Sequence, residues 1–286
     1  MADIFTGLSG FPITPLLGNE LNLDALKKIR ACIDSSGLDS IGVLGSTGSF
    51  AYLTASQRAT VFECWSEAKT PWIAGVSATS TKEALATCKI AQQNGASAVI
   101  ANAFAYVPLT NNELSHYFLR IADASELPVC VYDNPITTGQ KLTHDILAIL
   151  AKHPNIKATK MFAKENNTEQ HKALALLDWQ AGYAVDANCC EAMIGGASAW
   201  YSTLAGTLPE LLVPVVKAIK DGDITKARAL NQANQPIYAL MKQYTGYRAM
   251  HVFANIRGWQ CELPSPLDLP IIEKAKELIT EAISGH

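Results

Sequence analysis

Two lysines lie within residues 155–161, whose branched and apolar side chains predict a β-strand. Side chains alternate along a strand, so Lys160 shares one face with Ile156 and Ala158. Lys157 lies on the opposite face and is expected to point to solvent or to a helix layer. If the first face lines a closed barrel, burial lowers the pKa of Lys160 and frees its amine to attack a carbonyl carbon. The alternative is a lysine at a strand end that reaches water.

Two further groups that can act on a carbonyl compound stand where strands are expected to end. Tyr132 closes the predicted strand 128–132, and a phenol in that place can relay protons. Ser46 and Thr47 lie in the segment 45–49, GSTGS, directly after another predicted strand. Hydroxyls and backbone N–H groups of such a loop can bind a carboxylate. Taken singly, each feature is also explained by a packed tyrosine or by an ordinary tight turn.

A second tyrosine, Tyr106, lies in the apolar segment 104–108, which follows the predicted strand 97–101. The loops after the strands of a βα barrel share one face, so Tyr106 is expected on the same face as the other candidates. An aromatic side chain in an apolar loop is equally typical of an interface between chains. The two roles are compatible, and both stay open.

These candidates need elements that bring strand ends together, and the chain alternates about eight short apolar runs with longer helical patterns. The predicted strands are residues 8–13, 40–44, 72–76, 97–101, 128–132, 155–161, 181–185 and 197–203. The predicted helices are residues 23–36, 54–69, 80–94, 110–125, 143–152, 167–177, 188–194 and 208–221. Eight units favour a TIM (β/α)8 barrel over an open doubly wound sheet. No GxGxxG motif opens the first helix, as a dinucleotide-binding half would require.

The strand signals cease after residue 222, and three more helices are predicted at residues 223–243, 246–257 and 270–284. A proline-rich connector, residues 263–270, precedes the last of them. No Gly/Ser-rich linker separates this tail from the rest, so the tail is expected to pack on the barrel. The predicted domains are a catalytic barrel, 1–222, and a C-terminal helical extension, 223–286.

Composition narrows the class of protein. The 286 residues are 49% hydrophobic, which indicates a folded chain, and 23 Lys+Arg against 26 Asp+Glu leave a net charge of -3. Without a basic run, nucleic acid is not an expected partner. No apolar run approaches the ~18 residues of a membrane span, and the start of the chain lacks a signal-peptide pattern, so a cytoplasmic protein without a membrane partner is expected. Seven cysteines without CxxC spacing indicate buried thiols rather than a disulfide or metal scaffold.

The motifs also occur together in one order. GSTG follows the second predicted strand, Tyr132 and Pro135 form a Y-x-x-P turn after the fifth, and Lys160 comes six residues after Pro154 in the sixth. In this combination the chain resembles the dihydrodipicolinate synthase and N-acetylneuraminate lyase family over essentially its whole length. The resemblance implies a TIM barrel with a C-terminal helical domain, assembled as a homotetramer that is a dimer of dimers. It also implies a class I aldolase, a lyase whose lysine forms a Schiff base with a 2-oxo acid, most often pyruvate, without a cofactor or metal.

The resemblance further implies a role for each candidate residue. Lys160 is the imine-forming lysine, and Tyr132 is the phenol that shuttles protons to the substrate. Ser46 and Thr47 bind the carboxylate of pyruvate, and Ser46 also links the tyrosines by hydrogen bonds. Tyr106 matches a tyrosine that in many members reaches across the dimer interface into the neighbouring site. Because an iminium is an electron sink, a carbon–carbon bond at C3 can form or break through an enamine.

The chain departs from the family pattern at several places. Ser49 stands where the family loop usually has a glutamate, and Asp133 replaces the usual asparagine of the turn. Thr137 occupies the place of the arginine that binds aspartate semialdehyde in dihydrodipicolinate synthases, which argues against that activity because a charge-assisted donor is missing. Asp186 is followed by Ala187, whereas sialic-acid lyases tend to have an Asp-Glu pair.

The expected activity is therefore that of a pyruvate-type aldolase or lyase that is not a true dihydrodipicolinate synthase. Its substrate is expected to be a 2-keto-3-deoxy sugar acid or a hydroxy-oxo dicarboxylate, with Thr137, Asp186 and residues near Trp200 lining the acceptor pocket. One alternative is a Schiff-base dehydratase or deaminase of the same family that acts on a 2-oxo acid or a related cyclic imine. Another is a non-catalytic barrel that binds a 2-oxo acid.

Overall fold

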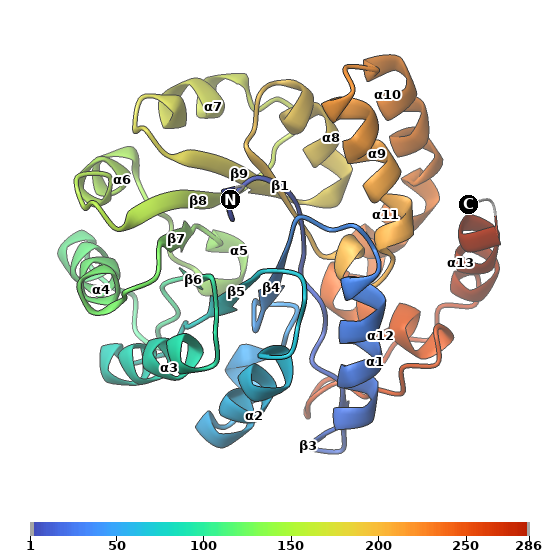
Figure 1. Cartoon of the computed structure of the whole chain (residues 1–286), viewed down its shortest axis with the longest axis horizontal. Coiled ribbons are helices and arrows are strands. Elements are labelled where there is room, and N and C mark those ends of the chain that lie inside the picture. The colour runs from blue at the N-terminus through green and yellow to red at the C-terminus, as the bar shows by residue number, and fades with distance from the viewer. Residues whose placement is uncertain (1–2, 285–286) are drawn as a thin grey trace.

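The structure, a computed structural model, describes residues 3–284 and forms a closed barrel of eight parallel strands (Figure 1). Around the barrel the order is β1, β10, β9, β8, β7, β6, β5 and β4, so β1 closes the sheet by pairing with both β10 and β4. The strands are β1 (Gly7–Gly10), β4 (Ser40–Val43), β5 (Trp72–Gly75), β6 (Ala98–Ala101), β7 (Val129–Tyr132), β8 (Ile156–Phe162), β9 (Gln180–Ala184) and β10 (Ala199–Ser202). The predicted TIM barrel is confirmed, and each predicted strand overlaps one of these.

Helices between the strands form an outer ring (Figure 1). They are α1 (Leu23–Asp34), α2 (Ala55–Trp65), α3 (Thr81–Gln93), α4 (Asn111–Ala124), α6 (His144–Leu150), α7 (Thr168–Ala175), α8 (Asp186–Ile194) and α9 (Val213–Lys220). Thr54 begins α2 with a capping box, in which its side chain and that of Gln57 each satisfy a free backbone N–H group. The helix predicted from residue 208 begins only at α9, because Pro209–Leu211 forms a separate 3-10 turn.

Buried side chains form one cluster inside the barrel and a larger one between the strands and the helices. The inner cluster contains Phe5, Phe11, Ile73, Ala98, Ile100, Cys130, Ala158, Ala199 and Tyr201. Ala158 is inside as predicted, but the prediction that Ile156 shares the face of Lys160 is wrong, because Ile156 belongs to the outer cluster. The register shifts there, since Val129 pairs with Ile156 and the next residue, Cys130, pairs with Ala158. The extra residue of this β-bulge is Lys157, which is exposed.

Short elements that the sequence patterns did not indicate flank the barrel strands. A hairpin of β2 (Leu16–Leu17) and β3 (Glu20–Leu21) turns at Gly18, whose φ of 59° is one that glycine adopts readily. The one-turn helix α5 (Pro135–Thr138) follows β7, and further 3-10 turns lie at Phe50–Tyr52 and Leu204–Gly206. The hairpin contacts the far end of the chain, because the backbone N–H of Glu262 donates to the carbonyl of Leu16 at 2.8 Å.

The tail consists of α10 (Ile224–Ala233), α11 (Gln235–Tyr244), α12 (Gly246–Ile256) and α13 (Ala275–Ser284). The single helix predicted over 223–243 is two helices that meet at Asn234, where Pro236 in the first turn of α11 has no N–H to continue the ladder. The last helix starts at Ala275 rather than at residue 270.

The tail helices pack on the barrel helices, as the absence of a flexible linker predicted (Figure 1). α10 contacts α8 and α9, and α11 contacts α8, while α12 and α13 pack against α11. The division into domains 1–222 and 223–286 stays a prediction, and residues 1–2 and 285–286 of these ranges lie outside the described residues. Within residues 3–284, no helix is both long enough and apolar enough to cross a membrane. All seven cysteines are free, and five of them are buried.

Candidate active site

Lys160 lies near the carboxyl end of β8 and points into the barrel, where only 5% of its surface is exposed. Aromatic rings surround its amine: the Nζ atom is 3.7 Å from the ring centre of Phe11, 4.1 Å from that of Tyr132 and 5.9 Å from that of Tyr201. The interior position predicted for this lysine is therefore what the structure has.

Burial decides the protonation of this amine. Loss of water around the charged form lowers the pKa of Lys160 from 10.5 to about 7, although Cys130, Asp186 and Cys189 act in the opposite direction. The rings around Nζ favour the ammonium form but do not offset the loss of hydration. Near neutral pH a large share of the amine is therefore unprotonated, and this is the form that can attack a carbonyl carbon.

Tyr132 lies beside Lys160, since the two residues are partners in the register of β7 and β8. Burial raises the pKa of the Tyr132 phenol to about 12, while a hydrogen bond with the side chain of Ser46 acts to lower it. The phenol is thus protonated at neutral pH and hydrogen-bonded to a hydroxyl of the 45–49 loop. It can pass a proton between that loop and a group bound to Lys160.

The 45–49 loop starts from a strained residue, because Leu44, directly after β4, has a φ of 57°. A side chain at Gly75 of the neighbouring strand would overlap with the carbonyl of Leu44, so the glycine permits the loop to lie close to β5. Within the loop, Ser46 is half-buried and its Oγ atom is 3.4 Å from Nδ2 of Asn134. The buried Thr47 hydroxyl lies 3.3 Å from that of Thr203.

Ser49 and Asp133, two of the residues at which the sequence departs from the pattern that it resembles, have local partners. Ser49, with a φ of 61°, places its Oγ atom 2.7 Å from the hydroxyl of Tyr247 on α12 and so fastens the loop to the tail. Asp133 is buried, and its carboxylate accepts a hydrogen bond from the backbone N–H of Leu142 at 3.0 Å. Burial raises the pKa of Asp133, which this hydrogen bond partly opposes. Both residues stabilise the loops that surround the site.

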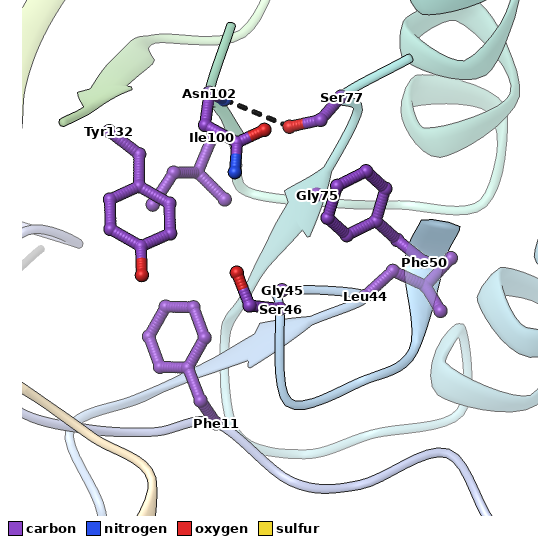
Figure 2. A pocket seen from close by; sticks show the side chains of 10 residues that line it. All are labelled: Phe11, Leu44, Gly45, Ser46, Phe50, Gly75, Ser77, Ile100, Asn102 and Tyr132. Carbon is purple, nitrogen blue, oxygen red and sulfur yellow. Dashed lines mark hydrogen bonds between the residues drawn. The ribbon is translucent and has the colours of Figure 1, made fainter. Parts of the chain in front are cut away.

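A small cavity lies between the 45–49 loop and Tyr132, and Figure 2 shows the side chains that line it. Its lining residues are Phe11, Leu44, Gly45, Ser46, Phe50, Gly75, Ser77, Ile100, Asn102 and Tyr132. Asn102, just after β6, is 2% exposed and directs its amide into this space (Figure 2). Its backbone N–H donates to Ser77 Oγ at 2.9 Å, whereas its Oδ1 atom has no hydrogen-bond partner among the described residues. The cavity volume of about 10 Å³ is room for about one water, which can satisfy the Asn102 amide oxygen.

Asp186 begins α8 after Val185, whose φ of 82° is strained for a β-branched residue. The Asp186 carboxylate is buried and accepts hydrogen bonds from the indole Nε1 of Trp200 at 2.8 Å and from the backbone N–H of Leu204 at 3.1 Å. Burial raises its pKa, which these donors and Lys160 oppose. Its expected role in binding a substrate stays a prediction, and each of its oxygens already has a partner within the chain.

The remaining predicted residues lie away from Lys160. Thr137, on α5, is exposed at the face where the barrel strands end. Tyr106 is 97% exposed beside Val107, which is 65% exposed, and it makes no contact with Tyr132 that would complete a relay within one chain. The structure thus brings together Lys160, Tyr132 and Ser46, but not Tyr106.

Sequence patterns missed several neighbours of the amine. Phe11, Tyr201 and Cys130 belong to the cluster inside the barrel, and Asn102 directs its amide into the cavity. Alternation along β7 could have identified Cys130, because it lies two residues before Tyr132 and therefore on the same face of the strand.

Among residues 3–284, no group of three or more His, Cys, Asp or Glu side chains is arranged to hold a metal ion.

Comparison with curated proteins finds similarity along the whole chain. A family model described as the dihydrodipicolinate synthetase family matches residues 4–284. The 4-hydroxy-tetrahydrodipicolinate synthase of Methanospirillum hungatei is 30% identical over an alignment of 290 positions, gaps included, which covers 98% of this chain and 97% of that protein. The N-acetylneuraminate lyase of Citrobacter koseri is 27% identical over 293 residues, which cover 97% of each chain.

Solved structures have the same fold. The dihydrodipicolinate synthase of Agrobacterium tumefaciens superimposes with a TM-score of 0.91 at 34% identity, covering 98% of this chain and 97% of the other. The chloride-inhibited dihydrodipicolinate synthase of Acinetobacter baumannii, solved in complex with pyruvate, has a TM-score of 0.88 at 25% identity and 98% coverage of both chains.

Proposed function

The chain belongs to the dihydrodipicolinate synthetase family and is a lyase, and we propose that it forms an imine between Lys160 and a 2-oxo acid of the pyruvate type. The observation that carries this proposal is the buried amine of Lys160, whose pKa is lowered to about 7 beside the phenol of Tyr132. A buried lysine without an ion-pair partner destabilises the fold, so its position is best explained by chemistry that needs a neutral amine.

The proposed reaction begins when the carboxylate of the 2-oxo acid binds to the hydroxyls and backbone N–H groups of the 45–49 loop. The lone pair of Lys160 Nζ then attacks the C2 carbonyl, and the former carbonyl oxygen gains protons and leaves as water. Tyr132, hydrogen-bonded to Ser46, passes these protons. The resulting iminium accepts the electron pair of the bond that breaks at C3, or supplies an enamine that attacks an aldehyde.

Two observations support pyruvate or a close derivative as the 2-oxo acid. The similar synthase of Acinetobacter baumannii was solved in complex with pyruvate. The residues around the small cavity beside Tyr132 also include Ser46 and Ser77, whose hydroxyls are hydrogen-bond donors for a short carboxylate.

The second substrate is proposed to differ from aspartate semialdehyde. Thr137 is exposed and uncharged where a synthase is expected to carry an arginine, so a second carboxylate lacks its bidentate partner. Ala187 follows Asp186, which also disfavours a sialic acid. We therefore propose cleavage or synthesis of a 2-keto-3-deoxy sugar acid or of a hydroxy-oxo dicarboxylate.

Borohydride trapping tests the imine. Incubation with pyruvate and cyanoborohydride is expected to add one reduced pyruvyl group, located on Lys160 by peptide mass spectrometry. Lys160→Met should abolish the adduct, whereas Lys157→Met, which alters an exposed lysine of the same strand, should not. If none of several 2-oxo acids is trapped by the folded wild type, the chain is a binding barrel rather than an imine-forming enzyme.

The products decide between reactions of the same imine. Release of free pyruvate from 2-keto-3-deoxy acids is the expected result. Loss of water or ammonia from an intact carbon skeleton would instead identify a dehydratase or deaminase, since the shared imine chemistry allows both.

Assembly as a homotetramer, a dimer of dimers, is proposed from the exposed aromatic and apolar pair Tyr106 and Val107. In such a dimer Tyr106 would enter the neighbouring site and complete the hydrogen-bonded relay that starts at Tyr132. Light scattering should give a tetramer, and a fully active monomer would contradict this role of Tyr106.

The free cysteines suit a reducing compartment, and we propose the cytoplasm as the location of the protein.

A further inference from the structure

The side chain of Phe11 covers the reactive amine. Phe11 follows β1 directly and is 1% exposed, and its ring centre lies 3.7 Å from Lys160 Nζ. The ring also packs edge-on against Tyr201, with centres 5.8 Å apart and planes at 88°. With Tyr132 on another side, at 4.1 Å, the amine is enclosed by aromatic rings.

The surrounding chain leaves room for this ring. A Cβ atom at Gly42 or Gly45 would overlap with the Phe11 ring, and one at Gly206 would overlap with the Phe11 backbone. Glycines at these places allow a large side chain to lie across the mouth of the barrel interior. The position of Phe11 is therefore determined by several elements and does not depend on one contact.

Phe11 also lies between the amine and the loop that is proposed to bind the carboxylate. Its ring contacts Lys160 on one side and approaches Gly45, the first residue of the 45–49 loop, on another. It lines the cavity that contains Ser46, whereas Lys160 is not among the residues that line this cavity (Figure 2). A 2-oxo acid bound to both the amine and the loop must span this place, so the ring has to turn away first.

We propose that Phe11 is a specificity-determining residue that shields the Lys160 amine from carbonyl compounds without a 2-carboxylate. The inference rests on the proposed function, because the loop that binds the carboxylate is also the loop on which the ring packs. A bound 2-oxo acid contacts both the Lys160 amine and the 45–49 loop, and these contacts can form only when the Phe11 ring is displaced. A simple aldehyde lacks the carboxylate and cannot offset the lost packing of the ring.

The test compares pyruvate with propanal, an aldehyde of similar length. Each is incubated with the protein and cyanoborohydride, and the adduct at Lys160 is quantified by peptide mass spectrometry. Phe11→Leu and Phe11→Ala are compared with Phe5→Leu, the matched control. Phe5 is equally buried in the same inner cluster but lines a hollow at the opposite end of the barrel.

Removing the ring is expected to raise the rate of propanal modification at Lys160 by up to about tenfold, since the edge-on aromatic packing that a displaced ring loses is worth a factor of roughly 2 to 13. The pyruvate rate should change less, so the ratio of the two rates falls. Rates are compared on their high-pH plateau, because a better hydrated amine also has a higher pKa. Phe5→Leu should leave the ratio of the two rates unchanged. If Phe11→Ala does not fold, Phe11→Leu still provides the test, because leucine retains most of the buried volume.

An unchanged propanal rate in both Phe11 variants would overturn the shielding role, as would an equal rise for pyruvate and propanal. If wild type fails to trap pyruvate, the proposed function fails instead. The propanal measurement still decides the role of Phe11 in that case, because it requires no carboxylate site.

Discussion

Replacing Lys160 by methionine is expected to stabilise the fold while removing the proposed nucleophile. A charged amine in the barrel interior lacks hydration, and the folded chain therefore holds the pKa of Lys160 at about 7 instead of 10.5. Methionine fills similar space between the rings of Phe11 and Tyr132 and has no charge to hydrate. Activity and stability are thus expected to change in opposite directions at this position.

The size of the effect follows from the pKa. Because one pKa unit corresponds to about 1.4 kcal/mol, a fall from 10.5 to about 7 amounts to a destabilisation of about 5 kcal/mol when the amine is charged. The full destabilisation applies below pH 7, where both the folded and the unfolded chain are protonated. Between pH 7 and pH 10.5 the unfolded chain binds more protons, so wild-type stability rises with pH. Above pH 10.5 the amine is neutral in both the folded and the unfolded chain, so the destabilisation disappears.

Urea unfolding measured by tryptophan fluorescence from pH 6 to pH 10 provides the assay, since the chain has five tryptophans. Lys160→Met should exceed wild type by several kcal/mol at pH 6 and by much less at pH 10. Lys157→Met is the matched control, because this lysine is exposed on the same strand. Its effect should stay within about 0.5 kcal/mol at every pH.

The reasoning is refuted if the difference between Lys160→Met and wild type is the same at pH 6 and at pH 10. It is also refuted if Lys160→Met is less stable than wild type at pH 6. Either result would mean that the buried amine is not the destabilising charge that its position implies.

The rate of imine formation with pyruvate should rise with pH and level off above about pH 7, because the neutral amine of Lys160 is the nucleophile; a rate still rising beyond pH 9 would contradict this. Tyr132→Phe should form the borohydride adduct more slowly and lower turnover by about 10²–10⁴-fold, as loss of a proton relay predicts, and unchanged kcat would exclude that role. Ser49→Ala should reduce stability by about 1 kcal/mol and raise KM, since it removes the hydrogen bond to Tyr247. Tyr247→Phe should have the same effect, and additive effects in the double variant would show that the two hydroxyls do not interact.

Alternation along a strand was sufficient to separate the two lysines of β8. The pattern predicted an inward Lys160 and an outward Lys157, and the structure has one buried and the other exposed. The same rule failed for Ile156, because a bulge at Lys157 shifts the phase of the strand. A bulge depends on the pairing with β7, which no pattern within β8 reveals.

The helices show the same contrast between what a local pattern predicted and what it missed. Periodicity predicted helices around the barrel, but it joined α10 and α11 into one helix across Asn234. Pro236 was a local signal for that break. The hairpin of β2 and β3 has only two residues in each strand, which is too short for a periodic pattern.

By itself, the sequence determined the order of the βα units and therefore which chemical groups stand at the strand ends. Lys160, Tyr132 and Ser46 could be selected because such positions meet at one face of any βα barrel. Only the tertiary structure decided that Phe11 covers the amine and that Ser49 binds Tyr247, 198 positions away. These contacts arise when β1 closes against β10 and the tail packs on the barrel, and the resulting burial, rather than any local motif, lowers the pKa of Lys160.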